Sequence, residues 1–202
     1  KGGAMEIRVR DLWKAYGGVT VLQGVDFTAG PGVTCIMAPS GAGKTTLLRI
    51  LLGLEAADRG VAEGAENCRW AAVFQEDRLL EHLDAAGNLR FVLGRDYEAE
   101  KAAALLAELG LGNTDGKAVR EFSGGMRRRL ALARALLAKS DALALDEPFA
   151  GLDAETRERA RECLRRRAGE RPVLLVTHSP EDAAGLGAEI VRLPGGLRHC
   201  GE

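Results

Sequence analysis

The chain lacks several features that mark common classes of protein. No apolar run approaches the roughly 20 residues needed to span a bilayer, and no signal-peptide pattern stands at the start. The four cysteines, at positions 35, 68, 163 and 200, are widely separated and form no C-x-x-C pair, so neither a zinc site nor a disulfide framework is predicted. The formal net charge is −1, which gives no overall electrostatic bias toward nucleic acid. We expect a cytoplasmic protein that reaches a membrane only through partners.

The length sets a second limit. A chain of 202 residues can bury a full α/β core and is expected to form one domain of that size, without room for a second large domain. Residues 1–4 look like a cloning remnant before Met5 and are expected to carry no function. Two arginine runs, 127–129 and 165–167, are interpreted as solvated helix faces because glutamates are interspersed nearby.

A glycine-rich segment carries the strongest local signal. Residues 38–45 read APSGAGKT and match the phosphate-loop pattern G-x-x-x-x-G-K-[ST], except that Ala38 stands at the first position. A β-branched and apolar run at 33–37 precedes the segment, and residues 46–52 follow it with helical spacing. Strand, glycine-rich turn and helix form the context in which this pattern binds phosphate, rather than being a simple turn.

Each reactive position of this loop has a chemical purpose. Gly41 and Gly43 allow the backbone to curl so that N–H groups point at phosphate oxygens, with the helix dipole behind them. Lys44 is predicted to reach the β- and γ-phosphates, and Thr45 to ligate Mg²⁺. We expect Ala38 to be tolerated if its φ is negative, because glycine is required only at positive φ or where backbones approach closely.

An acidic pair follows a second apolar strand. Residues 143–148 read LALDEP, and side chains alternate along a strand, so the two carboxylates can serve two roles. Asp146 is predicted to lie near Mg²⁺ through water, and Glu147 to face the attacking water as general base. Alone, such a pair is typical of a solvated strand end; the phosphate loop favours the catalytic interpretation.

The order and spacing of further motifs resemble the ATP-binding subunits of ATP-binding cassette (ABC) transporters, over nearly the whole chain. Residues 122–126 read FSGGM and resemble the signature L-S-G-G-Q, with Met126 as a departure at the last position. Gln75 matches the Q-loop glutamine, residues 151–153 (GLD) match the D-loop, and His178 matches the switch histidine. The chain is thus identified as a member of this family.

The resemblance implies a set of site residues for ATP and Mg²⁺. The signature would cap the γ-phosphate of ATP held by the opposite subunit, His178 would hydrogen-bond that phosphate, and Tyr16 would stack on adenine. Met126 removes an amide that could bond across the dimer, but we expect activity to survive. The predicted catalytic residues are Glu147, His178, Lys44 and Gln75; the nucleotide-binding residues are Tyr16, Ser40, Gly41, Ala42, Gly43, Lys44, Thr45, Thr46, Ser123, Gly124, Gly125 and Asp153; the metal ligands are Thr45, Gln75 and Asp146.

The same resemblance implies the fold. We expect an α/β P-loop NTPase of the ABC type, as one domain over residues 5–202, with a mainly parallel core sheet and an N-terminal antiparallel layer. A helical subdomain is expected at about 77–120, between Q-loop and signature, and only a short tail after Pro194. The strands expected from the sequence cover 6–9, 21–28, 33–37, 143–146, 173–177 and 189–193, and one charged helix is expected at 154–168.

The implied function is ATP hydrolysis that powers transport. Two copies would sandwich two ATP molecules, and membrane permease subunits would contact the groove beside Gln75, with an extracytoplasmic substrate-binding protein outside. Residues 74–80, FQEDRLL, resemble the F-Q-E-x-x-L-L segment of importer ATPases of the nitrate, sulfonate, taurine and pyrimidine-precursor group. His82 and Gly87 depart from that group's pattern.

Two alternatives follow from the same motifs. One is a soluble non-transport cassette ATPase, but DNA-repair types need a long insertion for which there is no space, and translation types carry two cassettes. The other is a regulatory module that binds ATP without hydrolysis, against which Glu147 and His178 argue.

Overall fold

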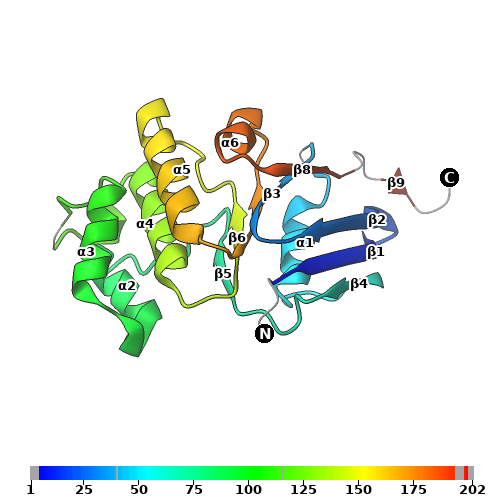
Figure 1. The fold of residues 1–202 in the computed structure, drawn as a ribbon, viewed down its shortest axis with the longest axis horizontal. Helices are drawn as coiled ribbons and strands as arrows, with labels where there is room; N and C mark the ends of the chain where they lie inside the picture. The colour runs from blue at the N-terminus through cyan, green and yellow to red at the C-terminus, as the bar shows by residue number, and fades with distance from the viewer. Residues whose placement is uncertain (1–4, 40, 115, 194–197, 200–202) are drawn as a thin grey trace. The chain divides into compact units, whose positions relative to one another are not determined.

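The structure is a computed structural model that describes residues 5–39, 41–114, 116–193 and 198–199 (Figure 1). The chain divides into two compact units. The first unit comprises Lys1–Trp70, Ser140–Ala144 and Glu170–Glu202, and the second comprises Ala71–Lys139 and Leu145–Gly169. Within the described ranges, every helix is too short or too polar to span a bilayer.

An antiparallel sheet occupies the N-terminal part of the first unit. Its order is β4-β1-β2-β9, with β1 at Ile7–Tyr16, β2 at Val19–Ala29, β4 at Arg59–Glu63 and β9 at Arg198–His199. The predicted antiparallel layer is confirmed, although β1 and β2 are longer than the sequence indicated. The hairpin between them turns at two glycines with positive φ, Gly17 at 54° and Gly18 at 83°, as a tight two-residue turn requires.

The second sheet has the order β5-β6-β7-β3-β8. Its strands are β3 (Gly32–Met37), β5 (Trp70–Val73), β6 (Ala142–Asp146), β7 (Pro172–Val176) and β8 (Glu189–Arg192). β3 runs parallel to both β7 and β8, and β6 and β7 are buried along their whole length. Near-continuous apolar runs are typical of parallel strands covered on both faces, so the α/β fold class with a parallel core sheet is confirmed.

Two helices belong to the first unit. α1 spans Lys44–Leu51 and buries Leu47, Leu48 and Leu51, whose spacing places them on one face of the helix. α6 spans Pro180–Gly185 and is capped by the Ser179 side chain. α1 follows β3 after the glycine-rich loop, which is the strand, turn and helix order predicted from the sequence.

The second unit is mainly helical (Figure 1). α2 spans Ala85–Leu93, α3 Ala99–Glu108, α4 Gly124–Leu137 and α5 Ala154–Ala168, and two 3₁₀ turns, η1 and η2, cover Gly94–Asp96 and Val119–Glu121. The side chains of Asp84, Ser123 and Asp153 cap α2, α4 and α5, which explains where these helices begin. The helical character expected at about 77–120 is present, whereas the subdomain boundaries remain a prediction.

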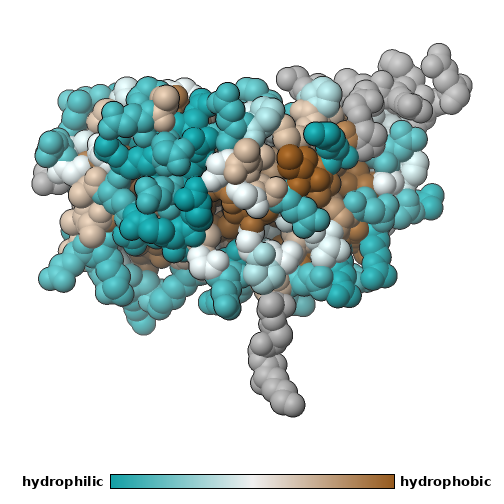
Figure 2. Space-filling view, turned by 45° about the horizontal axis from the view of Figure 1, so that its top comes forward, coloured by the Kyte–Doolittle hydropathy of each residue, from teal (hydrophilic) through white to brown (hydrophobic). Residues whose placement is uncertain are grey.

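The arginine run of α5 is only partly a solvated face. Hydrophilic residues cover the region of α5 on the face drawn in Figure 2. Arg167, however, is half-buried and forms a 2.7 Å ion pair with Glu108 of α3, to which Arg166 also donates. Burial acts to raise the pKa of Glu108, but hydrogen bonds from Arg167 and Cys163 and the charges of both arginines together lower it. The purely solvated interpretation is therefore wrong for Arg167, because α3 packs beside the C-terminal turns of α5.

Candidate functional site

The phosphate loop of the first unit is shaped by its own backbone. Gly41 and Gly43 have φ angles of +79° and +81°, which L side chains adopt only with strain. A Cβ at Gly43 would lie 2.7 Å from Leu22 Cδ2 and 2.8 Å from the Val21 carbonyl oxygen. Ala38 is not among the described non-glycine residues with positive φ. The condition set for alanine, a φ that is not positive, is therefore met, whereas the tolerance of alanine in nucleotide binding stays a prediction.

The start of α1 presents the predicted phosphate and metal groups. Lys44 is the first residue of the helix, and its Nζ donates hydrogen bonds to the carbonyl oxygens of Ala38, at 2.6 Å, and Pro39, at 3.0 Å. The ammonium group is therefore held over the loop. Thr45 is exposed and Thr46 half-buried in the same turn, where helix N–H groups lack intrahelical acceptors and favour anions. Ser40, also predicted to bind nucleotide, lies outside the described residues.

Tyr16, predicted to stack on adenine, ends β1 with 45% of its surface exposed. Its hydroxyl donates a hydrogen bond to the Glu55 carboxylate, and the Lys14 ammonium lies 5.3 Å from the ring centroid. Partial burial and the Glu55 carboxylate raise the pKa of Tyr16, so the phenol keeps its proton. Glu55 in turn lies 3.6 Å from Lys14 and 3.3 Å from Arg49. An exposed aromatic face with a fixed edge suits a stacking partner.

His178 follows β7 and is exposed. The backbone around it is fixed on both sides. The Ser179 amide donates to the Thr177 hydroxyl at 3.1 Å, and the Ser179 hydroxyl accepts from the Asp182 amide at 3.3 Å. The imidazole is therefore carried by a rigid strand end, which is the position that the sequence predicted.

The two carboxylates of the second unit have different surroundings. Asp146 ends β6 with 4% exposure. Glu147 is half-buried and adopts a φ of +48°, which is uncommon for a residue with a side chain. Its carbonyl accepts a hydrogen bond from the Ala150 amide at 3.1 Å. Such backbone strain is concentrated at functional sites in proteins, so Glu147 is a strong candidate for a catalytic group.

The signature and D-loop line a single cavity of about 640 Å³ in the second unit. Ser123 caps α4 by accepting the Met126 amide at 3.3 Å, and Asp153 caps α5 by accepting the Thr156 amide at 2.9 Å. Hydrogen bonds from Thr156 lower the pKa of Asp153. The signature and the D-loop lie close together, since a Cβ added at Gly125 would lie 3.2 Å from Leu152 Cδ2. The lining residues include Ser123, Gly124, Gly125, Gly151, Leu152 and Asp153.

Two arginines that the sequence analysis placed on a solvated face also line this cavity. The Arg128 side chain is only 10% exposed. Arg129 donates to the carbonyl oxygens of Gly125, at 3.1 Å, and Leu109, at 2.8 Å, and its burial lowers its pKa. The interpretation is therefore wrong for residues 127–129 as a run. The available signal was geometric, because three successive helix residues are separated by about 100° each and cannot share one face.

Gln75 lies just after β5 and is exposed. Its main chain is held by Arg128, whose Nη2 donates to the Gln75 carbonyl at 2.7 Å. Its side-chain amide thus extends from a backbone that a buried arginine anchors. This anchor was not predicted, since nothing in the local sequence announces it.

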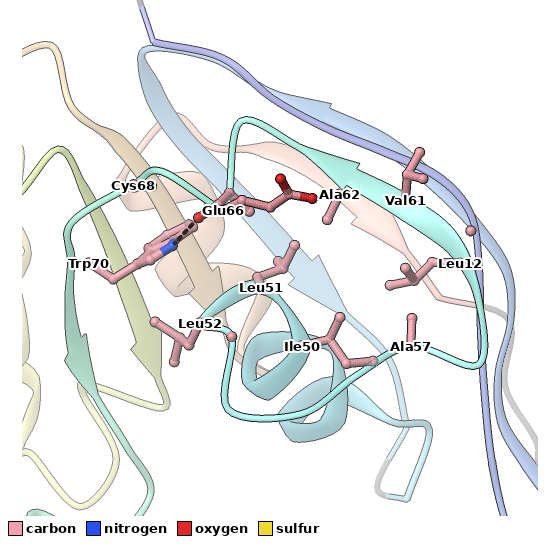
Figure 3. Close-up of a pocket in the computed structure, with 13 residues that line it drawn as sticks. Leu12, Ile50, Leu51, Leu52, Ala57, Val61, Ala62, Glu66, Cys68 and Trp70 are labelled. Atoms are coloured by element: carbon pink, nitrogen blue, oxygen red, sulfur yellow. Dashed lines mark hydrogen bonds between the residues drawn. The ribbon is translucent and has the colours of Figure 1, made fainter.

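A smaller cavity of about 310 Å³ lies in the first unit, between α1, β1 and β4 (Figure 3). Its walls are mostly apolar, including Leu12, Ile50, Leu51 and Trp70, and the Trp70 indole donates to the Ala65 carbonyl at 3.3 Å. Burial raises the pKa of Cys68, at its edge, to about 11. No predicted site residue is among those that line it.

The oxygen donors suit Mg²⁺ rather than a softer metal. In the described part of the chain, no group of three or more His, Cys, Asp or Glu side chains is placed to hold an ion. The predicted ligands are instead the Thr45 hydroxyl, the Gln75 amide oxygen and the Asp146 carboxylate, all hard donors that Mg²⁺ accepts together with water and phosphate oxygens. Each predicted ligand thus carries an oxygen donor of the kind that Mg²⁺ takes, and that they hold the ion together stays a prediction.

Comparisons with known proteins agree with this set of motifs. The sequence pattern of the ABC transporter family matches residues 22–150. The aliphatic sulfonates import ATP-binding protein SsuB 1 of Rhodococcus jostii is 43% identical over 185 residues, covering 88% of this chain and 75% of that protein. SsuB of Corynebacterium glutamicum is 41% identical, covering 93% and 80%. The sulfate/thiosulfate import ATP-binding protein CysA of Methylococcus capsulatus is 38% identical, covering 95% and 61%.

Proposed function

The chain belongs to the ABC transporter family and is one of its ATP-hydrolysing subunits, and we propose that it powers import through separate permease subunits. Its relatives are named for the import of aliphatic sulfonates and of sulfate or thiosulfate. We accordingly propose a small oxyanion, most simply a sulfonate, as the transported molecule. We propose that the permease and an extracytoplasmic binding protein select the substrate, because the motifs found in this chain serve the nucleotide and not the transported molecule.

The cavity shared by the signature and the D-loop carries the proposal of a composite site. Its wall contains Ser123, the α4 N-terminus and two arginines, which favour an anion. It also contains two carboxylates, Asp77 beside Arg128 and Asp153 as the cap of α5. The phosphate loop belongs to the other unit and has its own set of N–H donors and a lysine. Two anion-binding surfaces in one chain fit a homodimer in which each ATP is held by the phosphate loop of one copy and the signature of the other.

The proposed chemistry is in-line attack of water on the γ-phosphorus, which breaks the bond to the β–γ bridging oxygen and releases ADP and inorganic phosphate. Glu147 accepts the proton of that water, and His178 hydrogen-bonds the γ-phosphate. Lys44 and the partner copy's signature offset the negative charge that develops on the phosphoryl oxygens. Thr45, Asp146 and Gln75 would hold a Mg²⁺ ion, which would supply further charge neutralisation when bound. The main-chain amide of Met126 donates to the Ser123 hydroxyl oxygen, and this bond does not involve the methionine side chain. Methionine at this position therefore leaves the contacts of Ser123 and of the glycines available.

The remaining proposals concern organisation and location. We place residues 5–202 in one cassette domain with the helical subdomain at about 77–120. As an import ATPase the protein would sit at the inner face of the cell membrane, bound to its permease. Residues 74–80 and the exposed Phe91 and Val92 of α2, with 69% and 49% exposure, are available in the second unit for that contact.

The first experiment is the oligomeric state of a Glu147→Gln variant with and without ATP in Mg²⁺-free buffer, measured by light scattering. We expect an ATP-dependent dimer, since the variant cannot hydrolyse the nucleotide that joins the two copies. Steady-state hydrolysis by this variant should fall at least about 100-fold. Glu170→Gln, at an exposed glutamate, is the matched control and should hydrolyse ATP normally. A variant that binds ATP but stays monomeric would contradict the composite site.

The importer assignment needs its own test. Reconstituted into vesicles with its permease subunits, the protein should hydrolyse ATP faster when the binding protein and a sulfonate are present. ATP turnover that no transport substrate affects would favour the soluble alternative, and ATP binding without turnover would favour the regulatory one.

A further inference from the structure

We propose that Arg128 is a positioning residue that couples the signature cavity to Gln75, an inference that rests on the composite site proposed above. The coupling runs through residues 74–80, which we call the Q-strap. Arg128 contacts the Q-strap and also lines the cavity into which the partner copy's phosphate would enter. Every contact in this argument lies within the second unit.

The Q-strap is held from outside rather than by secondary structure of its own. Arg128 donates to the carbonyl oxygens of Phe74, at 2.6 Å, and Gln75, at 2.7 Å. Arg134, six residues further along α4, donates to the carbonyl oxygens of Asp77, at 2.9 Å, and Arg78, at 2.7 Å. Four successive or near-successive carbonyl groups thus depend on two guanidinium groups of the signature helix.

The far end of the Q-strap is fixed by α2. The Asn88 side chain accepts from the Leu80 amide at 2.8 Å and donates to the Leu80 carbonyl at 3.0 Å. Between these anchors, Arg78 has a φ of +47° and its guanidinium lies 4.4 Å from the centroid of the Phe74 ring. A segment with such strained backbone keeps its shape only through external contacts. Moving α4 therefore moves the backbone that carries Gln75.

Arg128 has a counter-ion whose attachment is incomplete. Asp77 Oδ1 lies 3.0 Å from Arg128 Nη1, yet this buried oxygen has no partner with hydrogen-bond geometry. Arg128 and Asp77 Oδ1 therefore attract each other as charges but form no well-directed hydrogen bond. Burial raises the pKa of Asp77, and the charges of Arg128, Arg127 and Arg134 oppose that effect. An anion with better geometry could displace Asp77 from the guanidinium.

The cavity beside Arg128 would receive such an anion. Arg128, Asp77 and Ser123 all line it, and a planar guanidinium binds phosphate through paired hydrogen bonds. A phosphate oxygen that draws Arg128 toward the cavity weakens its bonds to Phe74 and Gln75. This coupling is reciprocal. The factor by which phosphate binding changes the stability of the Arg128 contacts to the Q-strap is also the factor by which fixing those contacts changes the affinity for phosphate.

Substitutions of Arg128 and Asp77 are expected to change the ATP concentration for half-maximal dimerisation in opposite directions. Lysine at position 128 keeps the charge but cannot bridge two carbonyl groups and a phosphate. In the Glu147→Gln background, Arg128→Lys should raise the ATP concentration for half-maximal dimerisation about tenfold, within the usual range for coupled sites. Asp77→Asn removes the competing carboxylate and should lower that concentration about fivefold. Arg127→Lys, whose own partner is Glu81 at 2.9 Å, is the matched control and should change it less than twofold.

Amide hydrogen exchange at residues 74–80 gives the second readout. In the parent variant, ATP-dependent dimerisation should change exchange rates in the Q-strap about tenfold, whereas in Arg128→Lys the rates should be the same with and without ATP. A merely structural role of Arg128 predicts that both substitutions weaken dimerisation, or that Arg128→Lys leaves the response to ATP intact, and either result overturns the proposal. If Arg128→Lys fails to fold, the sign of the Asp77→Asn effect still decides.

The two levels of the proposal fail differently. A parent Glu147→Gln chain that never dimerises with ATP contradicts the composite site and removes the coupling with it. A parent that dimerises while Arg128→Lys responds like Arg127→Lys contradicts the coupling alone.

Discussion

Two loops of this protein are kept in shape by opposite means. The phosphate loop, 38–45, is shaped by its own backbone, with glycines at positive φ and one glycine too close to β2 for any side chain. The Q-strap, 74–80, contains no glycine and is held by side chains from α4 and α2. The first loop resists movement because of local sterics, whereas the second follows the helices that hold it. The loop proposed to hold the nucleotide thus depends on its own backbone, and the loop proposed to transmit movement depends on side chains of neighbouring helices.

The largest expected effect tests the first loop. Gly43→Ala places a Cβ 2.7 to 2.9 Å from atoms of Val21 and Leu22 at a strained φ, so ATP binding and hydrolysis should fall at least about 100-fold. Gly41→Ala is the matched control, since φ is almost the same but no atom lies within 4 Å of the added Cβ. Its loss should be about tenfold or less. Nucleotide titration and ATPase assays measure both, and equal losses would show that close packing is not what shapes the loop.

The second expected effect tests the Q-strap. Asn88 is 1% exposed and makes hydrogen bonds to both backbone groups of Leu80. Asn88→Ala leaves these groups without their partner and should lower the free energy of unfolding by about 3 kcal/mol. Urea denaturation gives this value, and Asn67→Ala, at an exposed position, is the control with little expected change. A stable Asn88→Ala protein would mean that α4 alone holds the segment.

The smallest expected effect tests whether a side-chain contact stabilises the fold when it is exposed rather than buried. Arg69 donates to both carboxylate oxygens of Asp141, as close as 2.7 Å, but its side chain is 70% exposed. This pair lowers the pKa of Asp141 from 3.8 to about 2. The folded state therefore binds the proton less readily, and the contribution of the pair, present above about pH 4, is lost as the pH falls toward 2.

Asp141→Asn should accordingly flatten the fall in stability between about pH 4 and 2 while changing stability at pH 7 only slightly. Urea midpoints measured across this range provide the check, with Glu162→Gln as an exposed acidic control. A large loss of stability at pH 7 would show that an exposed ion pair stabilises the fold as much as a buried contact does.

The same contrast explains which parts of the fold were predictable. α5 was predicted at 154–168 and has these bounds, because its cap and apolar spacing are local in sequence. β4, in contrast, was missed. Its residues are mostly exposed, and Gly60 is needed because a Cβ would lie 2.1 Å from the Asp11 carbonyl oxygen of β1. That requirement joins residues about fifty positions apart, and no local pattern records it.

The site divides in the same way. The sequence identified the phosphate loop, signature and D-loop, since each requires particular residues at fixed spacing, and the structure brings the last two to one cavity. The roles assigned to these residues remain predictions. Arg128 and Arg134 were not identified, because their contacts to the Q-strap span 53 to 57 positions. An arginine in a run of charge gives no sign of which carbonyl group it will meet.

Glu147 adopts a φ of +48°, a conformation that costs a residue with a Cβ roughly 1–2 kcal/mol and a glycine very little. Glycine at this position would therefore favour folding while removing the proposed general base. Selection for thermal stability alone would favour this substitution and yield a more stable protein that no longer hydrolyses ATP. Anyone engineering a more durable version of the chain should select for survival and turnover together.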